Sequence, residues 1–130
     1  MRLVAYETKI NCSQPTQVLQ ELMEDAVNNY LSWQPKVFPI DRQDMFISLK
    51  VQKSYRSSGE ILTIAIDKEA FSIASRCIIQ PKRSIAWGKN RDNVLALSGC
   101  VRDAIAELTH RSGRTTHFKK ASFFQLLDNG

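Results

Sequence analysis

The stretch MFISLKVQKSY, residues 45–55, alternates apolar and polar side chains. In an extended chain such alternation sends successive side chains to opposite faces. The inward set is Ile47, Leu49 and Val51, and the outward set is Ser48, Lys50, Gln52 and Ser54. This pattern predicts a strand with one face on a core and the other in water, as is common in antiparallel sheets.

The segments around this strand extend the same sheet. Residues 56–59 are polar and end in glycine, so they are predicted to form a turn from which residues 60–67 return as the second strand of a hairpin. After another short turn, residues 71–79 alternate again, and residues 84–87 are predicted to add a short last strand. Near the start of the chain, residues 3–10 also have strand character.

Two other segments repeat apolar residues every three or four positions, which is typical of amphipathic helices. They predict helices near residues 15–32 and 91–112, the second capped by Asn90 or Asp92. Residues 34–44 contain two prolines and are predicted to be a loop, because proline interrupts backbone hydrogen bonding.

The predicted order is therefore β-α-β-β-β-(β)-α. It indicates an α+β fold, an antiparallel sheet of four to five strands with two amphipathic helices on one face. Residues 1–130 are expected to form one domain, with residues 113–130 as a basic segment ending in a short apolar anchor. The order helix, three strands, helix within residues 15–108 resembles the double-stranded-RNA-binding domain, a resemblance that assigns no residues.

Composition and motifs exclude several classes of protein. With 43% hydrophobic and 24% charged residues, the 130-residue chain is expected to be globular, and no apolar run approaches the length of a membrane span. Three cysteines, Cys12, Cys77 and Cys100, are scattered without a CxxC pair, which favours a reducing cytoplasm over a disulfide scaffold. We therefore expect a cytoplasmic protein.

No sequence motif for catalysis or cofactor binding is present. The chain lacks a P-loop, a GxGxxG and a GxSxG motif, and His110 and His117 have no third ligand at metal-binding spacing. Cys12 precedes a predicted helix, whose N-terminus lowers thiol pKa values, but it has no identifiable base. We expect no cofactor and no metal site, and a non-catalytic protein rather than an enzyme.

Charge is distributed unevenly along the chain. The net charge is +5, yet residues 1–75 hold eight basic and nine acidic side chains, whereas residues 76–120 hold ten basic and three acidic ones. Such asymmetry favours contact with a polyanion. The leading hypothesis is a binding protein for nucleic acid or another polyanion.

The candidate polyanion-binding residues flank the predicted last strand and continue into the basic segment. Cations at a helix start oppose its dipole, so an anion is expected there, held also by free N–H groups, and an adjacent tryptophan can stack on a base. The set is Lys82, Arg83, Trp87, Lys89, Arg91, Arg111, Arg114, Lys119 and Lys120.

Two alternatives stay open. The first is a protein–protein module or homodimer that uses the flat, small-residue face of the sheet, with Ser48, Lys50, Thr63, Ala65, Ala74 and Arg76 as candidate interface residues. The second is a small enzyme or ligand-binding protein whose pocket leaves no mark in the sequence.

Overall fold

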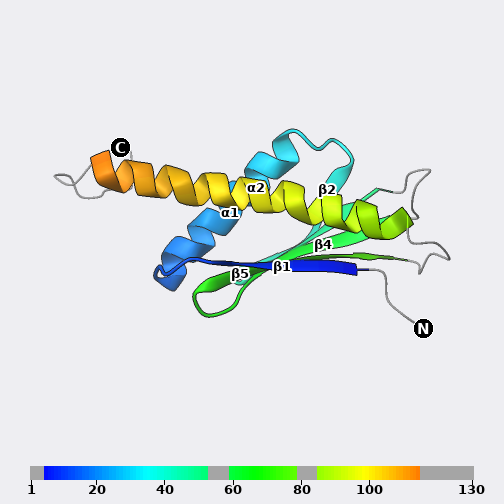
Figure 1. Cartoon of the computed structure of the whole chain (residues 1–130), viewed down its shortest axis with the longest axis horizontal. Helices are drawn as coiled ribbons and strands as arrows, with labels where there is room; N and C mark the ends of the chain where they lie inside the picture. Colours follow the sequence, from blue (N-terminus) through cyan, green and yellow to red (C-terminus); the bar gives the residue numbers. More distant parts are fainter. Residues whose placement is uncertain (1–4, 53–58, 79–84, 115–130) are drawn as a thin grey trace.

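The computed structural model describes residues 5–52, 59–78 and 85–114 (Figure 1). Its elements follow in the order β1 (Ala5–Asn11), α1 (Thr16–Ser32), β2 (Val37–Gln43), β3 (Phe46–Val51), β4 (Glu60–Ile66), β5 (Ala70–Cys77) and α2 (Ile85–Arg114).

The five strands form one antiparallel sheet in the spatial order β1-β5-β4-β3-β2. Strands β2 to β5 run as a meander, and β1 pairs with β5 at the other edge. Both helices lie on the same side of the sheet in Figure 1, with α2 crossing β1 and β5. The predicted α+β class with an antiparallel sheet is confirmed.

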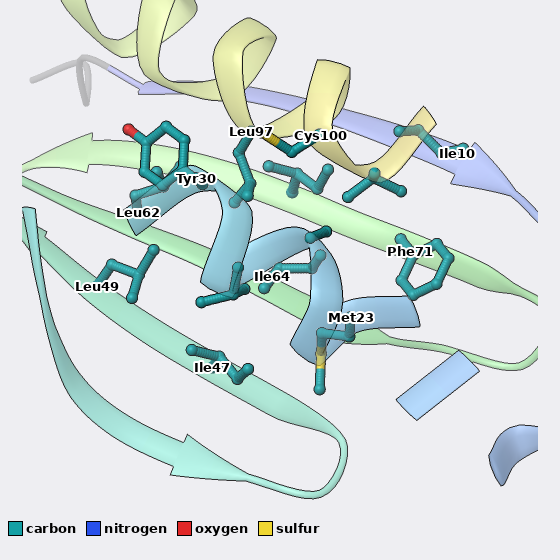
Figure 2. Close-up of a cluster of buried hydrophobic side chains, with 14 of the residues drawn as sticks. Ile10, Met23, Tyr30, Ile47, Leu49, Leu62, Ile64, Phe71, Leu97 and Cys100 are labelled. Atoms are coloured by element: carbon teal, nitrogen blue, oxygen red, sulfur yellow. The ribbon is translucent and has the colours of Figure 1, made fainter. Parts of the chain in front are cut away.

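The apolar core lies between the sheet and the helices (Figure 2). Alternate residues of the central strands point inward, as the sequence pattern predicted, and Ile47, Leu62 and Ile64 are fully buried. Helix α1 covers them with Met23 and Tyr30. Burying each such side chain contributes about 1.5–3 kcal/mol, so this packing is the main force holding α1 on the sheet.

Strand β2 corrects the prediction of a loop at residues 34–44. A proline is tolerated in an edge strand, where its missing N–H faces away from the sheet. Pro39 pairs with Leu49, and the register then shifts between Pro39 and Asp41. Only Val37 of this strand is buried, which is why its sequence lacks the alternation that marks the central strands.

The start of α2 corrects a second prediction. Residues 84–87 were expected to form a strand, but α2 begins at Ile85, before the expected caps Asn90 and Asp92. Asn90 and Asn93 are buried against the sheet and continue the inward face of Val94 toward the N-terminus. Because four strands separate the two helices, the order also departs from that of the double-stranded-RNA-binding domain.

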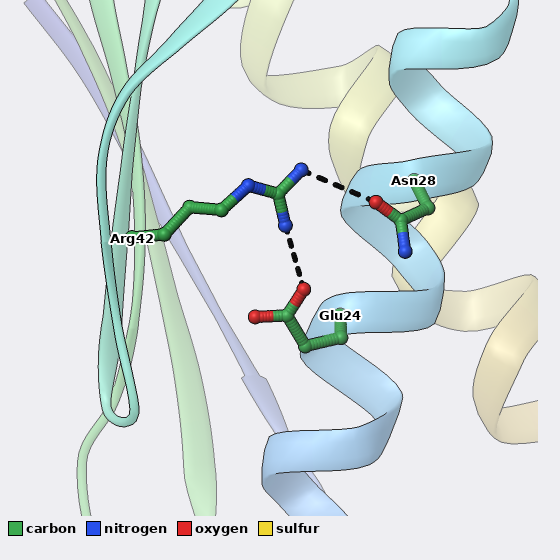
Figure 3. Close-up of polar contacts among 3 residues, drawn as sticks. All are labelled: Glu24, Asn28 and Arg42. Carbon is green, nitrogen blue, oxygen red and sulfur yellow. Dashed lines mark hydrogen bonds and ion pairs between the residues drawn. The ribbon is translucent and has the colours of Figure 1, made fainter.

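An ion pair links the β2 edge to α1 (Figure 3). Arg42 Nη1 lies 2.6 Å from Glu24 Oε1, and Arg42 Nη2 donates to Asn28 Oδ1 at 3.2 Å. The Arg42 and Glu24 side chains are 35% and 44% exposed, so the pair contributes at most about 0.5 kcal/mol. Separately, no helix within the described residues is long and apolar enough to span a membrane.

Candidate functional site

A buried polar cluster, which we call the polar corner, lies where α2 crosses the ends of β4 and β5. It consists of the buried Glu60, Ser75, Asn90 and Asn93 and of Cys77, which is only partly buried. Asn93 Nδ2 donates to Glu60 Oε1 at 3.0 Å and to Ser75 Oγ at 3.2 Å. Ser75 Oγ donates in turn to Asn90 Oδ1 at 2.7 Å, and Asn90 Nδ2 lies 3.5 Å from Cys77 Sγ.

The backbone explains why these side chains meet. Glu60 opens β4 and pairs with Cys77, the last residue of β5, so both occupy the same end of the sheet. Asn90 and Asn93 are three residues apart in α2 and therefore share one helical face. Glu60 is fully buried, and a carboxylate is costly to bury unless it is hydrogen-bonded, so the hydrogen bond from Asn93 offsets part of that cost.

A cleft of about 460 Å³, the α2 cleft, opens beside the polar corner. Asn93 forms part of both, since its side chain bonds to Glu60 and also lines the cleft. The other lining residues come from α1, β2, β3 and α2 and from the segments that follow α1 and β3. They are Tyr30, Gln34, Pro35, Lys36, Val37, Val51, Gln52, Lys89, Asp92 and Ala96.

Two cations and one carboxylate set the electrostatics of the α2 cleft. Lys36 is exposed and Lys89 is half-buried, and neither ammonium group has an ion-pair partner among the described residues. Asp92 offsets part of their positive potential. Tyr30 forms the inner wall, and burial, with Cys100 and Glu60 nearby, raises the pKa of Tyr30 well above its usual range. Its hydroxyl is therefore protonated at neutral pH.

The structure brings one of the predicted polyanion-binding residues into this cleft. Lys89 lines it, whereas Arg91 is exposed and does not. Both lie beyond the first four residues of α2, so neither sits beside the free N–H groups on which the predicted anion site depended. The side chains of Trp87, Arg111 and Arg114, and residues Lys82, Arg83, Lys119 and Lys120 altogether, lie outside what the structure describes.

The predicted interface residues share the outer face of the sheet. Register aligns Ser48 with Thr63 and Ala74 in one row. Lys50 and Arg76 flank Ile61 in the next row, and Ala65 lies opposite Phe46. Among the described elements none covers this face in Figure 1. Its use as an interface stays a prediction.

The thiols lack the environment of a nucleophile. Cys12 is buried, and burial raises the pKa of its thiol, the opposite of the activation that a helix N-terminus can give. Burial likewise raises the pKa of the Cys77 and Cys100 thiols. In the described part of the chain, no three His, Cys, Asp or Glu side chains are placed to hold a metal ion.

Sequence reasoning did not single out Glu60, Asn90, Asn93, Tyr30 or Lys36 as site residues. One signal was present: Asn90, Asn93, Val94 and Leu97 follow helical spacing, so the two asparagines extend an apolar face. Polar residues that continue the buried stripe of a helix indicate a buried hydrogen-bond network. Lys36 offers no such signal, because only the fold brings it near α2.

Comparison with known proteins gives little further information. No protein-family model matches the chain, and no curated protein matches it in sequence. Among solved structures, a crystal structure of the ZhuI aromatase/cyclase from Streptomyces sp. R1128 aligns with a TM-score of 0.29 and 11% identity, over 91% of this chain and 99% of that one. A likeness this weak carries no argument about function.

Proposed function

We propose that the protein binds a small anionic ligand in the α2 cleft, with Lys36 and Lys89 as its charged contacts. The observation that carries the proposal is that two lysines, Lys36 in the segment after α1 and Lys89 in α2, converge on one cleft without an ion-pair partner among the described residues. A phosphate or carboxylate group would supply that partner through charge-assisted hydrogen bonds.

The size of the cleft favours a small molecule over a duplex. Pockets for small ligands enclose roughly 300–1,000 Å³, and the α2 cleft at about 460 Å³ falls in that range. A duplex needs many cations along an extended surface, whereas here Asp92 interrupts the positive charge. Gln34, Gln52 and Asn93 offer amide groups for the uncharged part of a ligand.

The proposal assigns binding and no reaction. Asp92 is the acid that lines the cleft, and it is exposed; Glu60 lies behind Asn93, is fully buried and accepts a hydrogen bond from Asn93. Asn93 thus separates the carboxylate from the cleft, and its orientation is fixed by the polar corner. A wall held in this way suits ligand recognition, because little ordering is left to occur on binding.

The test is calorimetric titration with two probes, pyrophosphate and AMP. Removing both lysines (Lys36→Ala with Lys89→Ala) should weaken binding at least about tenfold, because a charged hydrogen bond contributes roughly 1.5–3 kcal/mol. The matched control removes two exposed lysines outside the cleft (Lys9→Ala with Lys50→Ala) and should bind as the wild type does.

The results of these titrations distinguish a small anionic ligand in the α2 cleft from a polyanion bound elsewhere on the protein. A preference for AMP over pyrophosphate would identify a nucleotide rather than an inorganic anion as the ligand class. Equal loss in both double variants, or no binding of either probe to the wild type, would overturn the proposal. Tighter, steeply salt-dependent binding of a single-stranded oligonucleotide that survives loss of Lys36 and Lys89 would favour a polyanion surface elsewhere on the protein.

A further inference from the structure

A second depression, which we call the acidic groove, lies between α1 and α2, farther along α2 than the α2 cleft. Its volume is about 320 Å³. The floor is apolar, and four carboxylates and an asparagine surround it. The floor is Val18, Leu22, Cys100, Ala104 and Leu108, and the polar residues are Glu21, Asp25, Asn29, Asp103 and Glu107.

The two kinds of lining residue specify the chemistry of an occupant. Val18, Ala104 and Leu108 are only partly buried, so an apolar partner would remove further apolar surface from water. The four carboxylates disfavour an acidic partner, whereas they attract a partner that carries cations. The groove therefore fits a segment that places basic and large apolar side chains side by side.

The chain itself contains such a segment. Residues 117–127 read HFKKASFFQLL, with Lys119 and Lys120 four positions before Phe123 and Phe124. At that spacing a lysine and a phenylalanine would share one face of a helix. We propose that residues 117–127 dock in the acidic groove, with the lysines at its carboxylates and the phenylalanines on its apolar floor.

The chain that follows α2 is long enough to bring residues 117–127 back to the acidic groove. Helix α2 ends at Arg114, and seven residues of helix bring Glu107 about 10 Å from that end. Residues 115–118 can span about 13 Å when extended, which is enough to bring Lys119 back to Glu107. In Figure 1 the first turns of α1 and the last turns of α2 lie toward the same end of the molecule, so both walls of the groove are within reach.

Hydrogen–deuterium exchange on the full chain tests the proposal. In the wild type, amides 119–127 should exchange at least about tenfold more slowly than in the free peptide of residues 115–130, because docking protects them. Neutralising two groove carboxylates (Asp103→Asn with Glu107→Gln) should remove most of that protection. Phe123→Ser with Phe124→Ser should remove it as well, without changing any residue that lines the groove.

The matched control neutralises two exposed carboxylates away from the groove (Glu7→Gln with Asp44→Asn) and should keep wild-type protection. Free-peptide exchange rates in the wild type, or equal loss of protection in the control, would overturn the proposal. Protection that disappears on dilution would also overturn docking within one chain and would assign the groove to the segment of a second copy.

Discussion

The two ends of the core are built by different means. Around Leu62, Ile64 and Phe71 every inward side chain is apolar and fully buried. At the polar corner the same two strands carry Glu60 and Ser75, equally buried but held by hydrogen bonds to α2. The first region tolerates any good apolar fit, whereas the second requires particular partners at particular distances. Stability and specificity are thus located in separate parts of one interior.

The largest effect is expected in the apolar region. Leu62→Ala should lower the free energy of unfolding by about 2–5 kcal/mol, because it removes buried methyl groups and leaves a cavity under α1 and α2. Denaturant unfolding followed by circular dichroism measures this directly. Ile61→Ala, on the outer face of the same strand, serves as the control and should cost much less. A loss equal to the control would mean that the apolar region is not the main source of stability.

A smaller effect is expected at the polar corner. Asn93→Ala removes one donor to Glu60 and one to Ser75, and leaving buried polar groups short of a partner costs about 1–3 kcal/mol. Replacing both partners (Asn93→Leu with Glu60→Leu) should cost less than the sum of the two single changes, because the polar groups vanish together. Strictly additive losses in this double-mutant cycle would show that Asn93 and Glu60 do not act as a unit.

The smallest effect concerns Tyr30, which belongs to the apolar core and also lines the α2 cleft beside Asn93. Burial raises its pKa above the unfolded value of 10.0, so below that pH the hydroxyl is protonated in both states. As the pH rises above 10, the unfolded state loses the proton first and stability falls, by up to about 1.4 kcal/mol per pH unit. Tyr30→Phe keeps the ring but removes the hydroxyl that titrates, so the loss of stability above pH 10 should become smaller. Parallel stability curves for the two proteins between pH 9 and 11 would contradict it.

The sequence was informative where burial alone determines the residue type. Alternation located β3, β4 and β5, and helical spacing located α1, because their inward residues are apolar. It failed for β2, where an edge strand buries only Val37, and for the start of α2, where the buried residues Asn90 and Asn93 are polar. The α2 cleft could not be predicted, because Lys36 and Lys89 come together only through the path of the sheet.

The irregularity at Pro39 has a consequence for how molecules of this protein meet one another. An open sheet edge invites a foreign strand to pair with it, which is a route to fibres and aggregates. On the β2 edge, Pro39 has no N–H to donate, and the register shift before Asp41 breaks the even spacing that an incoming strand would need. The β2 edge is therefore protected against pairing with a foreign strand by Pro39, one of the two prolines from which a loop was predicted.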